Sequence, residues 1–201
     1  MSGLTKKQVA LVRSLYTRHG RKKSNLCVCE GERCCAELFS FRPELVEFAV
    51  CSSEFDFSHP DIDFIMVPSD VLQKISATVA SQGVLAVVKR PESLLSAMIP
   101  ADPFILILDR IADPGNFGTI LRTSQAVGLR EVWYTAGSTD PFSDKTIRSA
   151  MSAQFKVNLG CLPDLSSAVE LLFQFGYKNI HCNRGAAVSE MDVITVLFAH
   201  G

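Results

Sequence analysis

The chain has 201 residues, of which 47% are hydrophobic and 20% are charged, with 12 Gly and 9 Pro. These proportions exclude disordered, collagen-like and low-complexity proteins. No apolar run approaches the roughly 20 residues that cross a bilayer, and the basic N-terminus lacks the apolar segment of a secretory signal. We therefore expect a soluble, cytoplasmic protein with two hydrophobic cores and no membrane partner.

Charge is unevenly distributed along the chain. The net charge is −1, but the first 29 residues carry +7 without any acid, and the remainder carries −8. Such asymmetry points to a polyanion partner, although a solvated helix face would explain it about equally well. The basic residues of this segment are Lys6, Lys7, Arg13, Arg18, Arg21, Lys22 and Lys23.

The cysteine pattern argues against both metal sites and disulfide bonds. The chain has 7 cysteines, an odd number, with neither a CxxC pair nor a zinc-type spacing to histidine. Several lie in apolar, strand-like runs, where a thiol behaves as a small hydrophobic group. We expect reduced, mostly buried thiols, a cytosolic location and no metal site.

The first 90 residues alternate between helical and strand-like patterns, which predicts a layered α/β unit. Thr5 and Ser69 are expected to cap two of the helices. The predicted helices span 5–19, 32–39 and 68–81, and the predicted strands span 26–29, 45–51, 63–67 and 83–88.

Prolines separate this unit from the rest of the chain. Pro91, Pro100 and Pro103 bracket a stretch, 92–102, that has room for one short helix. This composition is typical of an interdomain linker. We expect a first domain over 1–90, a linker over 91–103 and a second domain over 104–201.

The second half begins with an apolar strand over 104–108, followed by a helix over 117–127 that Gly128 ends. A strand over 131–135 completes a βαβ unit, which requires a parallel sheet. Asp164 is expected to cap a further helix. That helix spans 165–175, and predicted strands follow at 178–182 and 193–198.

The segment from Asp113 to Arg122 carries the most informative pattern. It joins the carboxyl end of a buried strand to the start of a helix, where open α/β sheets bind ligands. Its Gly-x-x-Gly spacing matches neither the dinucleotide fingerprint nor the Walker phosphate loop. Asn116 is placed to cap the helix, and Arg122 follows about 9 Å along the axis, within reach of the same loop. Alternatively, Asn116 only caps the helix and Arg122 only covers surface.

Residues 104–159 resemble the SpoU (TrmH-like) family of RNA ribose 2′-O-methyltransferases, members of the knotted SPOUT class. The family pattern Asp-Pro-x-Asn-x-Gly-x-x-x-Arg-Thr is matched from Asp113 to Thr123, and the blocks 140–145 and 147–153 look like the next family motif. The family more often has Ser and Gly where this chain has Ala150 and Ser152. The N-terminal half is similar to the family's L30e-like substrate-binding domain, through 29–31 and 82–87.

The resemblance implies methyl transfer from S-adenosylmethionine to a ribose 2′-hydroxyl of tRNA or rRNA. It assigns catalysis to Arg122, with Asn116 positioning Arg122 or the ribose. Because a guanidinium stays protonated, orientation and charge stabilisation by Arg122 is a more conservative role than general base. Arg148 and Ser149 would line the RNA side of the site, and the basic N-terminal residues would hold the RNA backbone.

The family's cofactor-binding motifs are missing from this sequence. They are a Gly-x-Glu-x-x-Gly loop and a Ser-Leu-Asn segment, which thread the knot and build a homodimer interface, and neither occurs before Gly201. We therefore expect a truncated SPOUT domain that binds the cofactor weakly and is inactive alone, with dimerisation doubtful.

Two other functions stay open at this point. The chain could be an RNA-binding protein without catalysis, working through its L30e-like half. A doubly wound small-molecule enzyme has only fold-level support, since no nucleotide fingerprint is present.

Overall fold

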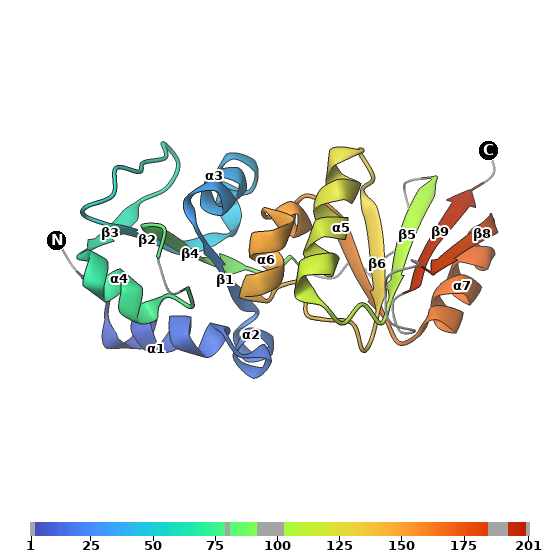
Figure 1. Ribbon diagram of the computed structural model, residues 1–201, viewed down its shortest axis with the longest axis horizontal. Coiled ribbons are helices and arrows are strands. Elements are labelled where there is room, and N and C mark those ends of the chain that lie inside the picture. Colours follow the sequence, from blue (N-terminus) through green and yellow to red (C-terminus); the bar gives the residue numbers. More distant parts are fainter. Residues whose placement is uncertain (1–2, 79–80, 92–102, 185–192, 200–201) are drawn as a thin grey trace.

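A computed structural model of the chain describes residues 3–78, 81–91, 103–184 and 193–199. Figure 1 shows two sheets side by side along the long axis, each with its own helices. The expected α/β fold is confirmed. Among the described residues, no helix is long and apolar enough to span a membrane.

The first sheet has the strand order β1-β4-β2-β3. β4 pairs antiparallel with both of its neighbours, whereas β2 and β3 run parallel. The predicted strands are thus all present. They span Leu26–Glu30 (β1), Val46–Ser52 (β2), Phe64–Val67 (β3) and Val84–Lys89 (β4).

Helices cover both faces of this sheet. α3 packs on one face with Val84, Ala86 and Val88 of β4, while α1 and α4 pack on the other with Leu85 and Val87. Because successive strand residues point to opposite faces, an unbroken apolar strand indicates a sheet covered on both sides. The helices span Lys6–Leu15 (α1), Arg18–Ser24 (α2), Glu32–Phe41 (α3), Pro43–Leu45 (the 3-10 helix η1) and Ser69–Ile75 (α4).

Two details of the first half differ from the predictions. The single helix expected over 5–19 is two helices, because Thr17 is extended (φ −97°, ψ 144°) and caps α2 by accepting from the Gly20 N–H. Thr5 caps α1 as predicted. Ser69 does not cap α4, since Pro68 occupies the cap position, and the Ser69 hydroxyl bonds Ser52 and Glu54 instead.

The second sheet has the order β7-β6-β5-β9-β8. β5, α5 and β6 form the predicted βαβ unit, and β5, β6 and β7 are parallel. β9 and β8 extend the sheet antiparallel on the far side of β5. The strands span Phe104–Asp109 (β5), Glu131–Thr135 (β6), Asn158–Leu162 (β7), Tyr177–Arg184 (β8) and Val193–Ala199 (β9).

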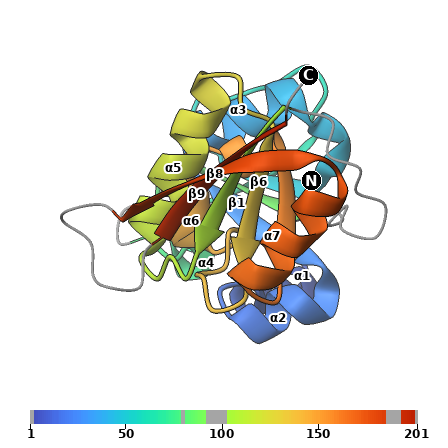
Figure 2. The same ribbon diagram turned by 90° about the vertical axis from the view of Figure 1, so that its right-hand side faces the viewer.

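This sheet is also covered on both faces (Figure 2). α5 and α6 pack on Leu106, Leu108 and Val132, whereas α7 packs on the opposite face around Trp133. Asp164 caps α7 as predicted. The helices span Pro114–Ala126 (α5), Asp144–Ala150 (α6), Ala153–Phe155 (the 3-10 helix η3) and Leu165–Gln174 (α7). The short helix considered for 92–102 lies outside the described residues.

The two halves share a core, which corrects the expectation of two separate ones. Phe142, Ile147 and Phe155 of the second half pack into the α3 side of the first sheet. Cys34 of α3 lies with its sulfur 3.3 Å from the Ile147 carbonyl oxygen. Shared apolar burial of this kind fixes the orientation of one half on the other, so α6 is held between β1 and α5.

Ser152 explains one departure from the family pattern. Its φ of +63° lies in the left-handed region, where glycine is favoured and where the family more often has Gly. The Ser152 hydroxyl donates to the Cys34 carbonyl oxygen at 2.9 Å, across the contact between the halves. A buried hydrogen bond therefore offsets the backbone cost of a side chain at this position.

Candidate functional site

The loop after β5 is held by the loop after β6. Thr135 donates to Asp109 Oδ1 at 2.6 Å and accepts from the Arg110 N–H at 3.1 Å. The Ile111 N–H donates to Ser138 Oγ at 3.2 Å. These bonds fix the chain at the carboxyl ends of two parallel strands, directly before the segment 113–122.

Asp113, and not Asn116, caps α5. The Asp113 carboxylate accepts from the Asn116 N–H at 2.7 Å, and Pro114 occupies the first helical position. Proline is favoured there because its missing N–H would have no partner anyway. The sequence prediction placed the helix start three residues late. The correction matters because the Asn116 side chain is released from capping and lies on the first turn of the helix.

Asn116 and Arg122 are both exposed on α5. Among the described residues, neither side chain makes a hydrogen bond or an ion pair. Six residues of α-helix give about 9 Å of rise and about 120° of rotation, so the two side chains start from different faces. A ligand lying along α5 can therefore contact both groups, whereas direct contact between them requires the full reach of the arginine.

α5 and α6 touch through Gly118 and Ser149. A Cβ built on Gly118 would overlap Ser149 Oγ and lie 2.8 Å from the Ala150 nitrogen, so only glycine permits this approach. The Ser149 hydroxyl lies 3.0 Å from the Pro114 carbonyl oxygen. Ser149 thus ties α6 to the first turn of α5.

A hollow of about 640 Å³ lies at this junction, lined by Asp113, Pro114, Gly115, Lys145, Arg148 and Ser149. Arg148 pairs with Asp144 at 3.0 Å, yet its Nη1 is buried and has no hydrogen-bond partner in the described chain. Lys145 is exposed on the same helix. The two cations outnumber the one carboxylate of the lining, that of Asp113, so the hollow beside this helix start favours an anion. Lys145 lies within the block matched to the family motif, but its role escaped the sequence analysis.

The basic N-terminal residues lie on α1 and α2, and all but one are exposed. In Figure 1, α1, α2 and the first turn of α5 lie toward the same lower edge of the molecule. The exposed residues are Lys6, Lys7, Arg13, Arg18, Lys22 and Lys23.

Arg21 departs from this group. Its residue is 4% exposed, and its guanidinium pairs with Asp140 at 2.8 Å and donates to the Leu15 carbonyl oxygen at 2.8 Å. A guanidinium engaged in this way cannot also bind a phosphate from solvent. The prediction of Arg21 as an RNA contact is therefore corrected: the residue joins α2 to the second half of the chain.

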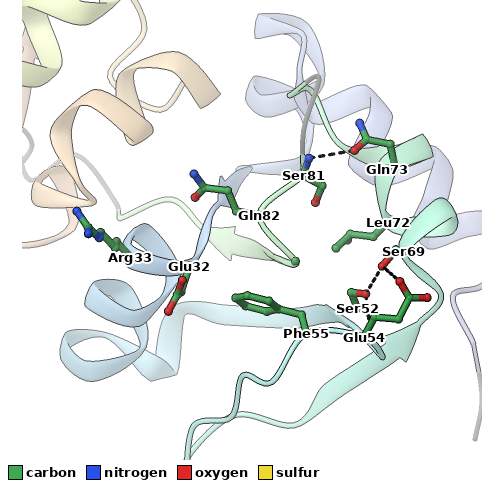
Figure 3. A pocket seen from close by; sticks show the side chains of 11 residues that line it. Glu32, Arg33, Ser52, Glu54, Phe55, Ser69, Leu72, Gln73, Ser81 and Gln82 are labelled. Atoms are coloured by element: carbon green, nitrogen blue, oxygen red, sulfur yellow. Dashed lines mark hydrogen bonds between the residues drawn. The ribbon is translucent and has the colours of Figure 1, made fainter.

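A second hollow, of about 730 Å³, lies at one end of the first sheet (Figure 3). Ser69 donates to Glu54 Oε2 at 2.5 Å, and its oxygen lies 2.6 Å from Ser52 Oγ. Glu32 and Arg33 of α3 contribute the opposite wall. No motif marked these residues, because they come from separate elements that only the fold brings together.

Among the six cysteines whose side chains the structure describes, five are buried, as predicted, and one is exposed; the prediction for Cys182 lies outside the described side chains. Cys27, Cys29, Cys34, Cys35 and Cys51 are buried and free, whereas Cys161 is exposed. Burial raises the pKa of the Cys27 thiol to about 12, so this group stays protonated. Within the described residues, no cluster of His, Cys, Asp and Glu could hold a metal ion.

Two family models match the chain. Residues 103–196 match the SpoU rRNA Methylase family, and residues 6–86 match the MRM3-like substrate binding domain. The 23S rRNA (guanosine(2553)-2′-O)-methyltransferase RlmP of Bacillus subtilis strain 168 is 30% identical over 148 residues, which are 72% of this chain. The chain spans 58% of that relative's own length.

Solved structures share the fold. A protein of the TrmH family from Porphyromonas gingivalis superposes with a TM-score of 0.71 at 27% identity, covering 87% of this chain and 69% of that one. An AdoMet-bound rRNA methyltransferase from Sinorhizobium meliloti gives a TM-score of 0.70 at 22% identity, over 88% of this chain and 69% of that one. At 22% identity, the second superposition shows a shared fold only.

Proposed function

Since the chain belongs to the SpoU (TrmH-like) family, with an MRM3-like substrate-binding domain before its SpoU domain, we propose that it acts in RNA 2′-O-methylation. The reaction would transfer a methyl group from S-adenosylmethionine to a ribose hydroxyl of tRNA or rRNA. The observation that supports this most is on α5, where Asn116 and Arg122 are exposed without internal partners in the described chain. The first turn of the same helix borders the hollow that Lys145 and Arg148 line.

The proposed role of Arg122 is electrostatic. A ribose 2′-hydroxyl gains negative charge as it attacks, and a fixed guanidinium nearby stabilises that charge and the adjacent phosphate. A guanidinium carries no acceptor for a proton, so we propose that Arg122 orients the ribose and neutralises charge and does not remove the proton itself. Asn116 offers both a donor and an acceptor, which suits it to hold the ribose in the attacking orientation.

Lys145 and Arg148 would hold the phosphate next to the modified ribose. They line the hollow at the first turn of α5, and Arg148 Nη1 is buried without a partner in the described chain. An RNA phosphate there would satisfy that donor and place the ribose over Asn116.

The exposed basic residues of α1 and α2 would bind phosphates of the RNA backbone that lie at a distance from the reacting ribose. Such contacts depend on salt, since each neutralised phosphate releases counterions. Lys22→Gln together with Lys23→Gln should weaken RNA binding without changing sequence preference. The slope of log affinity against log salt should fall by about 0.7 to 0.9 per lost contact.

The residues described around Asn116 do not by themselves fit S-adenosylmethionine. Lys145 and Arg148 line the hollow at the first turn of α5 and outnumber its one carboxylate, that of Asp113, so its net charge disfavours a sulfonium cation. The cofactor, when bound, supplies the electrophilic methyl group. We propose that for this reason the 201 residues bind it weakly.

A non-catalytic RNA-binding role is the second candidate. The hollow lined by Lys145 and Arg148 and the basic helices α1 and α2 favour RNA, and binding RNA requires no chemistry. We further propose domain limits of 1–90 and 104–201 with a linker over 91–103. Free buried thiols support a cytoplasmic location.

Transfer of labelled methyl groups to rRNA transcripts, measured on the polypeptide that the natural gene encodes, distinguishes the two functions. Arg122→Ala should lower methylation at least 100-fold, the size of a lost electrostatic contact in a transition state, while RNA affinity changes only a few-fold. Gln125→Ala, on the same helix and also exposed, is the matched control. Unchanged methylation in Arg122→Ala would remove the catalytic assignment, and an equal loss of binding and methylation would favour the binding role.

A further inference from the structure

A cavity of about 980 Å³ lies between the two halves of the chain. One side is formed where β1 begins and β4 ends, around Asn25 and Arg90, which are joined by a backbone hydrogen bond of 3.0 Å. The other side is formed by η3 and by β6 and β7 of the second sheet. The cavity is separate from the hollow at the start of α5, since the two share no lining residue.

Gln154 lines this cavity with an unusual lack of partners. The residue is 1% exposed, and both its Oε1 and its Nε2 are buried without a hydrogen bond in the described chain. Its neighbours Ala153 and Phe155 pack into different cores, which fixes the backbone of η3. A buried amide without partners destabilises a fold, so its presence calls for a ligand that completes its hydrogen bonds.

A second buried donor lies in the same cavity. Arg90 Nε has no hydrogen-bond partner in the described chain, and the guanidinium carbon lies 4.8 Å from the centre of the Phe142 ring. Two further cations of the lining are paired: Lys89 with Glu47 at 3.4 Å and Arg42 with Glu44 at 2.5 Å, which leaves the charge of Arg90. The lining therefore carries a net positive charge beside a neutral amide.

Aromatic side chains complete the wall. Tyr134, Phe142 and Phe155 all line the cavity, and the rings of Phe142 and Phe155 lie 5.8 Å apart. Flat apolar surface next to an amide and a guanidinium suits a planar, polar heterocycle that carries an anionic group. A nucleotide combines these features in one molecule.

We propose that this interdomain cavity binds one unpaired nucleotide of RNA. The donor and acceptor of Gln154 would pair with the edge of the base, as glutamine does with the adjacent donor and acceptor of adenine. The base would stack against the aromatic wall, and Arg90 would hold the phosphate. The site deepens the function proposed above, because it adds a second RNA contact on a surface that both halves build.

Nucleotide binding to the 201-residue chain tests the proposal without any catalysis. Titration with each of the four nucleoside 5′-monophosphates, followed by calorimetry, should show saturable binding. Inorganic phosphate should bind at least tenfold more weakly, because it lacks a base edge and a stacking surface. Equal affinity for phosphate and for all four nucleotides would reduce the cavity to an anion site and overturn the proposal.

Gln154→Leu is the decisive variant, since leucine has a similar volume and no polar atoms. We expect at least tenfold weaker nucleotide binding together with an unchanged or higher midpoint of thermal unfolding, because an unpaired buried amide has been removed. Gln174→Leu, at the exposed end of α7, should change neither quantity. Lower stability with unchanged nucleotide affinity in Gln154→Leu would show a structural amide and contradict the proposal.

Arg90→Met provides an independent check, since methionine keeps the apolar stem and removes the guanidinium. Arg90→Met should weaken the binding of nucleoside monophosphates at least fivefold and leave the binding of uncharged nucleosides nearly unchanged. An equal effect on nucleosides and nucleotides would place the phosphate elsewhere and refute the assigned orientation. These experiments measure no methyl transfer, so a negative result here does not refute the proposed function. That function is tested separately by Arg122→Ala.

Discussion

The ion pair between Arg21 and Asp140 should determine how firmly the two halves are joined. The two side chains are 5% and 10% exposed and lie 119 residues apart in sequence. Asp140 Oδ2 accepts from both Nε and Nη2 of Arg21 at 2.8 Å, and its Oδ1 accepts from the Phe142 N–H at 2.9 Å. Replacing Arg21 with Met keeps the apolar stem and leaves the Asp140 charge with only the Phe142 bond.

The expected cost is about 3 to 5 kcal/mol, which is the range for removing one partner of a buried pair. Three charge-assisted hydrogen bonds are lost, two to Asp140 and one to the Leu15 carbonyl oxygen. At the lower end of about 1.5 kcal/mol each, their sum lies within that range. Asp140→Asn keeps an acceptor for the Phe142 N–H but leaves the guanidinium uncompensated, so it should cost about as much. The double variant should cost about 2 kcal/mol less than the sum of the two single variants, because no isolated charge remains.

Urea unfolding followed by the fluorescence of Trp133, the only tryptophan in the chain, measures these free energies. Arg18→Met on the same helix is the control, since Arg18 is exposed and should cost less than about 0.5 kcal/mol. A cost below about 1 kcal/mol for Arg21→Met, or strict additivity in the double variant, would refute the reasoning that a desolvated pair joins the halves.

Two further predictions concern packing and pH. Gly118→Ala should destabilise the protein by about 1 to 3 kcal/mol and lower methylation, because the added Cβ would lie 2.8 Å from the Ala150 nitrogen and force α5 away from α6. Thermal unfolding measures the loss of stability. A shift no larger than that of Ser166→Ala, at an exposed helical position, would contradict the prediction. Burial raises the pKa of Cys27 from 9.0 to about 12, so its contribution to stability is complete below pH 9 and is lost as the pH rises toward 12. Urea titrations across that range should show a smaller loss in Cys27→Ala than in the parent, and identical pH profiles would disprove it.

Local elements were predictable because local patterns specify them. The apolar runs of β4 and β5, the Thr5 cap of α1 and the Asp164 cap of α7 follow from residue spacing and hydrogen-bonding chemistry within a few positions. One error, the start of α5, was also local in origin. Asp113 and Asn116 are both good capping residues, and sequence alone could not decide between them until the helix start was known.

The sequence by itself determined the α/β class, the βαβ unit around Asp113 and the asymmetry of charge, since periodicity and composition are properties of short segments. Only the tertiary structure decided what depends on contacts between distant residues. It showed Arg21 buried against Asp140, Ser149 against the first turn of α5, and Gln154 without a partner between the halves. Burial and hydrogen bonding over such separations in sequence arise when the two sheets pack, and no local pattern encodes them.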